Sequence, residues 1–116
     1  MATAPRPPHD RLADVHVPFV TAALLFAVFG GFALAFTLSL EGAMVGISLS
    51  WATHAQVHGQ LQVMGFAGCF VIGVAAKLAP RFGAGQPRPG LIDAAFWCLV
   101  LGLLGRVLGQ PLIAYA

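Results

Sequence analysis

The chain has 116 residues, of which 59% are hydrophobic and only 9% are charged, and its mean hydropathy is +0.86. Because a soluble domain carries about 25% charged residues, this composition excludes a soluble globular enzyme. The net charge of +2 rests on six basic residues, too few for a nucleic-acid-binding surface. We therefore expect an all-α integral membrane protein that contacts the lipid bilayer and has no nucleic-acid partner.

The first two predicted elements are a polar leader and a membrane-spanning helix. Residues 1–16 contain three prolines and several charged side chains, which indicates a leader outside the hydrocarbon. Residues 17–40 contain no charged side chain and would extend about 35 Å as a helix, enough to cross a hydrocarbon core of about 30 Å. After a connector, Thr53 and the Gln three residues later have the spacing of a capping box, which predicts a second transmembrane helix over residues 53–79.

A loop rich in proline and glycine follows, and a third transmembrane helix is predicted over residues 93–115. Asp93 falls in its first turn, where a carboxylate interacts favourably with the helix dipole. Residues 17–116 then form one three-helix domain. The basic residues that flank the spans share one side of the membrane: Arg6, Arg11, Lys77, Arg81 and Arg88. This distribution predicts a cytoplasmic N-terminus and an outward-facing C-terminus, which lies in the periplasm if the protein belongs to the inner membrane of a Gram-negative bacterium.

The second predicted helix carries a stripe of polar and small residues. At about 100° per residue, His54, His58 and Gln62 lie on one face, and small residues continue that face inward. Two imidazoles one turn apart can converge on one metal ion, or one of them can bind a haem iron. Alternatively, both histidines lie at the wet membrane interface and bind loop backbone only.

The third predicted helix has one charge in its interior, Arg106. An unpaired arginine in hydrocarbon costs about 2.5 kcal/mol or more, so we expect a partner such as a haem propionate or Glu41. Arg106 lies about 14 Å from the outer end of its helix, at the depth of Gln62 on the preceding helix. The outer half of the membrane is therefore expected to hold five polar side chains at comparable depths on two successive helices: His54, His58, Gln62, Arg106 and Gln110.

Several segments resemble, in order and spacing, the N-terminal spans of the NnrS family: His16–Phe26, His58–Phe66, the loop after Pro80, and Leu104–Arg106. Members of that family are bacterial membrane proteins that hold haem and copper and are linked to nitric oxide and nitrosative stress. The resemblance covers about residues 16–109. It implies that His58 corresponds to the first histidine of the family's His-x-His-Glu motif and Arg106 to its Gly-Arg. Gln60 and Leu61 stand where the family has its second histidine and its glutamate.

The resemblance implies a site near the outer face for haem and/or copper, with the metal on His54 and His58 and with Gln62, Arg106 and Gln110 around it. It also implies a role in the nitric oxide response or in one-electron transfer, with the chemistry carried by the cofactor. Because the family is longer, it also implies that the site is completed by other spans or subunits, or by the rest of a longer chain. Two alternatives remain open. One is a non-catalytic structural or assembly subunit of a larger membrane complex, and the other is a fragment of a subunit similar to the haem-copper oxidases.

Overall fold

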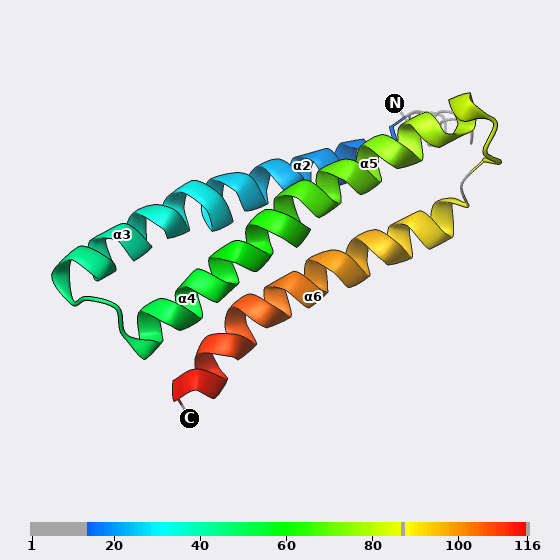
Figure 1. Cartoon of the computed structure of the whole chain (residues 1–116). Helices are drawn as coiled ribbons and strands as arrows, with labels where there is room; N and C mark the ends of the chain where they lie inside the picture. Colours follow the sequence, from blue (N-terminus) through cyan, green and yellow to red (C-terminus); the bar gives the residue numbers. More distant parts are fainter. Residues whose placement is uncertain (1–13, 87, 116) are drawn as a thin grey trace, which may run out of the picture.

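The computed structural model describes residues 14–86 and 88–115, the side chains up to residue 113, and consists of three long helical rods (Figure 1). The first rod comprises α2 (Val17–Leu25), η1 (Phe26–Ala33) and α3 (Leu34–Met44). The second comprises α4 (Leu49–Gln60), η2 (Leu61–Gly68), α5 (Cys69–Leu78) and η3 (Ala79–Phe82), and the third is α6 (Pro89–Tyr115). Each rod is long and apolar enough to cross a membrane. The predicted all-α architecture with three spans is thus confirmed. Most of the leader predicted over residues 1–16 lies outside the described residues.

The rods are longer than the sequence indicated, because the helix caps lie elsewhere. The second rod begins at Leu49, since the Ser48 hydroxyl accepts a hydrogen bond from the backbone N–H of Trp51 at 3.1 Å. The capping box expected at Thr53 is therefore wrong: Thr53 lies inside the helix and its hydroxyl donates to the Leu49 carbonyl at 2.9 Å. The third rod begins at Pro89, so Asp93 is not in its first turn.

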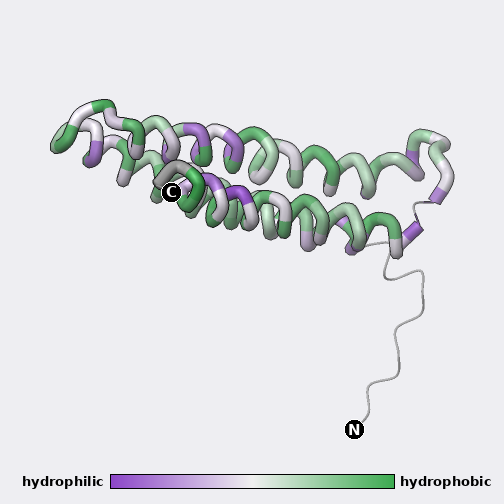
Figure 2. Tube along the Cα trace, turned by 90° about the horizontal axis from the view of Figure 1, so that it is seen from below, coloured by the Kyte–Doolittle hydropathy of each residue, from purple (hydrophilic) through white to green (hydrophobic). Residues whose placement is uncertain are grey.

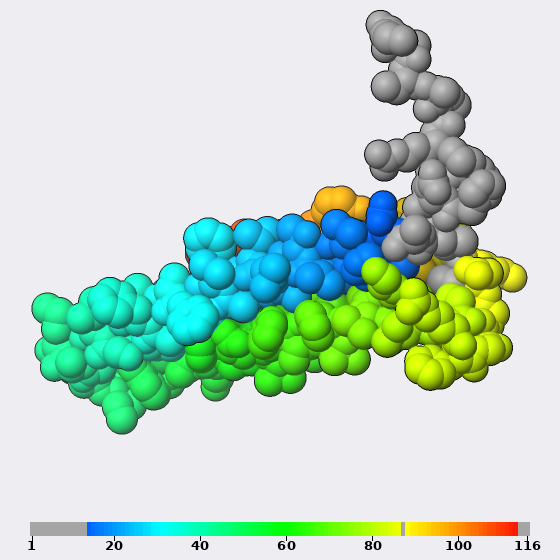
Figure 3. Space-filling view, turned by 90° about the horizontal axis from the view of Figure 1, so that it is seen from above, coloured from blue at the N-terminus to red at the C-terminus, as the bar shows by residue number. Residues whose placement is uncertain are grey.

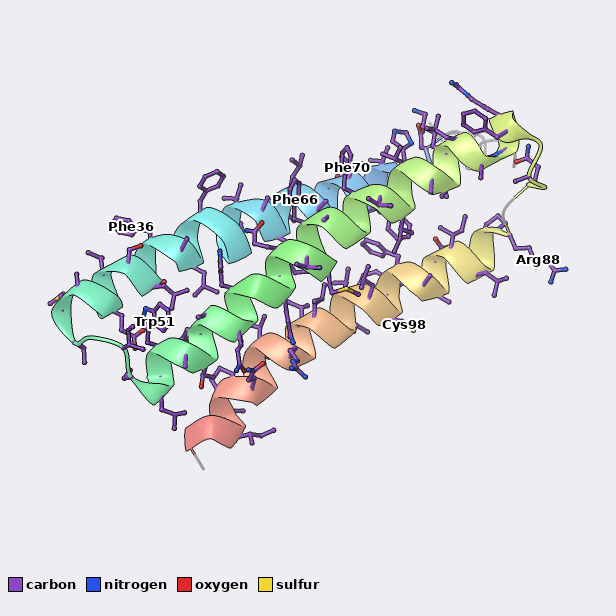
Figure 4. The ribbon with its side chains drawn as sticks, in the orientation of Figure 1. Phe36, Trp51, Phe66, Phe70, Arg88 and Cys98 are labelled. Atoms are coloured by element: carbon purple, nitrogen blue, oxygen red, sulfur yellow. The ribbon has the colours of Figure 1, made fainter. Side chains whose placement is uncertain are left out.

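A tight turn joins the first two rods. Val45–Ser48 is the whole connector, and Gly46 adopts a φ of 85°, a conformation that favours glycine. The indole Nε1 of Trp51 donates to the carbonyl of Leu38 at 3.1 Å and so ties the two rods together beside the turn (Figure 4). Gly83, with a φ of 82°, ends η3 at the opposite end of the bundle.

The first and second rods pack closely along their whole length (Figure 3). Three glycines, which we call the glycine seam, make this approach possible: Gly30, Gly65 and Gly73. A Cβ atom on Gly73 would lie 2.6 Å from the Cβ of Phe19, and one on Gly65 would lie 2.8 Å from the Cγ of Phe26. The stripe of small residues on the second rod therefore packs against the first rod. Without a hydrophobic driving force between helices in lipid, such close contact is what holds them together.

Both η1 and η2 are π-helical, and they lie against each other at mid-length of the rods. In η1 the hydrogen bonds reach five residues back, as from the N–H of Leu34 to the carbonyl of Phe29. Such wide turns are rare and are often found at functional sites. Within the described residues they place Gly30 and Gly31 on the surface that faces the second rod.

The third rod is the least covered. Its packing depends on Leu103, which is 7% exposed and contacts Val57 and Leu61. It also depends on an edge-to-face contact between the rings of Phe96 and Phe19, whose centroids are 5.2 Å apart. Most of its other apolar side chains are exposed, as expected for lipid-facing residues. Hydrophilic segments interrupt the apolar rods near the C-terminus (Figure 2). Both cysteines are free: Cys69 is buried and Cys98 lies on the outer side of α6 (Figure 4).

Candidate functional site

The five residues expected at one site fall into two groups on opposite faces of the second rod. The side chains of His54, His58 and Gln62 lie toward the first rod. Arg106 and Gln110 on α6 instead bind two glutamines of α4 on its other face. The structure therefore does not bring the imidazoles and the guanidinium together.

His58 makes the shortest polar contact between the first two rods. Its Nδ1 lies 2.7 Å from the carbonyl oxygen of Gly30 in η1. Because a carbonyl can only accept, Nδ1 carries the proton, and in the neutral ring Nε2 keeps its lone pair. A histidine that binds a metal or a haem iron is normally oriented in this way by a hydrogen bond from its other nitrogen.

A groove lies beside this imidazole, between the first two rods, and no residue of α6 lines it. It has a volume of about 420 Å³ and is lined by Ala27, Gly31, Phe32, Ala35, His58, Gln62 and Phe66. The small residues of the first rod recur every fourth position, so they form one shallow side of the groove. The Gln62 amide occupies the space that a Cβ on Gly31 would need. The groove therefore combines a flat apolar side with an imidazole and an amide.

His54 lies one turn closer to the start of α4 and has different partners. Its Nδ1 lies 3.4 Å from the hydroxyl of Ser50 and 3.7 Å from a carboxylate oxygen of Glu41. Glu41, which we expected as a partner of Arg106, thus pairs with His54 instead. Both side chains of this pair are partly exposed, so the interaction contributes little to stability.

The donor set fits haem better than a copper centre. The described part of the chain contains no group of three His, Cys, Asp or Glu side chains that could hold a metal ion. His54 and His58 direct their Nδ1 atoms to different partners. A single oriented imidazole, by contrast, would be enough to hold a haem iron.

The second group forms a row of polar side chains between α4 and α6, which we call the polar row: Gln56, Gln60, Arg106 and Gln110. The Nε of Arg106 donates to the Oε1 of Gln60 at 2.7 Å, and the Nε2 of Gln110 donates to the Oε1 of Gln56 at 2.6 Å. The Oε1 of Gln110 is buried without a hydrogen-bond partner among the described residues. Sequence analysis missed both glutamines of α4, although their spacing of four residues places them together opposite the histidines.

Comparisons with protein-family models, with curated protein sequences and with solved structures found no match. The resemblance to the NnrS family stays a prediction, and the geometry of the two groups carries the functional argument.

Proposed function

We propose that this chain is a haem-binding membrane protein of NnrS type, in which His58 would hold the haem iron. The observation that carries the proposal is the 2.7 Å contact from the Nδ1 of His58 to the carbonyl of Gly30, which leaves Nε2 available beside an open groove. Bound haem would supply nitric oxide binding or one-electron transfer.

Several residues in and beside the groove have a definite role in this proposal. The Gly30 carbonyl fixes the orientation and tautomer of the imidazole. Ala27, Gly31 and Ala35 leave room for a flat group, and Gln62 supplies a hydrogen-bonding amide. Arg106 and Gln110 take no part, because their hydrogen bonds lie on the opposite face of α4. Any further ligand of the iron, and the ligands of any copper, would come from another subunit or span.

Visible absorption of the purified protein, loaded with haem, tests this proposal. We expect a Soret band in the wild type that is lost in His58→Ala. Two control variants should keep it: His54→Ala, which removes the neighbouring imidazole, and Val63→Ala, which changes an exposed lipid-facing side chain. A wild-type protein that binds no haem, or a band that survives His58→Ala unchanged, would contradict the proposal.

We further propose that the chain lies in a bacterial inner membrane with the turn at residues 45–48 facing the periplasm. The basic side chains Lys77, Arg81 and Arg88 at the opposite end of the bundle support this orientation. A cysteine at Gly46, in a variant lacking Cys69 and Cys98, should react with an impermeant thiol reagent in intact cells. Labelling of a cysteine at Gly85 instead would show that the protein has the opposite orientation.

A second candidate function is a non-catalytic subunit that assembles with other membrane proteins. The observation that favours it is the poor coverage of the third rod: 6% of its most apolar stretch is buried, against 22% for each of the other two. A colourless, metal-free preparation of the wild type would support this second candidate function over haem binding.

A further inference from the structure

The polar row places a charged side chain on an uncovered membrane-spanning surface. Arg106 is exposed, and it lies about 14 Å from the end of α6 that is nearer to it. A guanidinium in hydrocarbon is costly unless it meets a partner or reaches water. The row therefore needs something beyond the described residues of this chain to cover it.

Arg106 does not extend toward the nearer membrane surface. Side chains of a helix lean toward its N-terminus, which for α6 is the more distant end. The hydrogen bond from Arg106 Nε to Gln60 agrees with this direction, because Gln60 lies about 17 Å from the start of the second rod at Leu49. The guanidinium is thus held within the membrane and does not snorkel to the outer interface.

No carboxylate of the described chain neutralises this charge. The ion pair between His54 and Glu41 is the one that the described residues form, and it lies on the other face of α4. Asp93, on the same helix as Arg106, is about 20 Å away along the axis. Gln60 satisfies one N–H group of Arg106 but contributes no negative charge.

The surface beside Arg106 is shaped for a helix. Gly105 and Gly109, four residues apart on α6, line a groove of about 540 Å³ together with Gln56 and Gln110. A Cβ atom on either glycine would meet nothing within 4 Å, and the same holds for Gly59 on α4. Glycines at this spacing let the backbone of a second transmembrane helix approach closely.

From this juxtaposition of an unneutralised guanidinium and open glycines, we infer that the polar row binds a transmembrane helix of another polypeptide that carries a carboxylate at the depth of Arg106. A second copy of this chain fits less well. A symmetric dimer through this face would set Arg106 against Arg106, and like charges repel strongly where water is absent. The inference gives the second candidate function its surface and partner chemistry, and it does not depend on haem binding.

Association with synthetic transmembrane peptides tests the inference. The full chain, labelled with a donor fluorophore, is reconstituted in phosphatidylcholine vesicles with acceptor-labelled polyleucine peptides of about 20 residues. One peptide carries a single Glu about 14 Å from its end, at the depth of Arg106, and the other carries only Leu. We expect the Glu peptide to bind about tenfold more tightly or better, as judged by energy transfer.

Three variants separate charge from shape. Arg106→Met should remove the preference for the Glu peptide, whereas Arg88→Met, which removes a positive charge from the loop, should keep it. Gly109→Ala should weaken binding of the Glu peptide without disturbing the chain itself, because nothing lies within 4 Å of the added Cβ. The haem absorption test is run on the same preparations, so failure of either proposal is visible separately.

Four outcomes would overturn the inference. The first is equal binding of both peptides by the wild type, and the second is a preference that persists in Arg106→Met. The third is loss of the preference when phosphatidylglycerol replaces part of the lipid, which would assign the row to an anionic headgroup. The fourth is self-association of the wild type that disappears in Arg106→Met, which would assign it to a second copy.

Discussion

Replacement of Gly73 by alanine gives the most direct test of how the first two rods are held together. The added Cβ would lie 2.6 Å from the Cβ of Phe19 and 3.3 Å from the carbonyl oxygen of His16, whereas carbon atoms in contact prefer about 3.5–4.0 Å. Phe19 is fully buried and its Cβ cannot rotate away, so the two backbones must separate. We expect the association of the rods to lose about 1–3 kcal/mol.

The buried thiol of Cys69 offers a measurement of this loss. Cys69 is 0% exposed and lies one turn from Gly73, and in a Cys98→Ala background it is the sole thiol of the chain. The reagent N-ethylmaleimide reaches Cys69 only while the two rods are apart. If the rods reclose faster than the reagent reacts, the labelling rate is proportional to the fraction of molecules whose rods are apart. In detergent micelles, Gly73→Ala should therefore raise the labelling rate of Cys69 by about 5-fold to about 150-fold.

Two further variants make this prediction refutable. Gly59→Ala, on the same rod but with open space around its Cβ position, should leave the rate unchanged or lower it. Gly30→Ala, whose Cβ would lie 2.7 Å from that of Leu61 and far from Cys69 along the rod, should raise the rate. If Gly73→Ala labels no faster than Gly59→Ala, the glycine seam does not hold the rods together.

Three smaller effects follow from the turn between the first two rods, each measurable by thermal unfolding in micelles. Ser48→Ala removes the helix cap and should cost about 1 kcal/mol, whereas Ser39→Ala, at an exposed helical position, should cost less. Trp51→Phe removes the hydrogen bond to the Leu38 carbonyl and should cost about 0.5–1.5 kcal/mol, and an unchanged midpoint would show that this bond contributes nothing. Gly46→Ala meets no neighbouring atom, so its expected cost of about 1–2 kcal/mol would come from the positive φ alone.

The spans could be predicted from the sequence because apolar runs of sufficient length have few alternatives to crossing a bilayer. Their ends could not be placed as well. Ser48 and Thr53 are both acceptable caps, and only the structure shows that the backbone leaves the helical conformation at Ser48. The small face of the second rod was also identified correctly, since Gly65 and Gly73 do lie against the first rod.

The level of the candidate site residues along the rods could be predicted, but not the helix face on which their partners lie. Arg106 was matched to Gln62 because both lie at a similar level, but it binds Gln60, which points about 200° away around the same rod. Which face of a helix meets which neighbour depends on the packing of whole rods, and the π-helical turns of η2 further change the rotation between its two ends. Neither effect is visible in the spacing of single residues.

The short turn after Met44 has a consequence for how the chain is assembled. Only four residues separate the first two rods, so bringing the rods together costs little conformational entropy in the connector. The same step brings the glycine seam into contact. The third rod follows a longer loop and buries few side chains within the described residues. The first two rods can therefore pack as a hairpin without α6, whose sparse contacts leave its place open to competition from a neighbouring polypeptide.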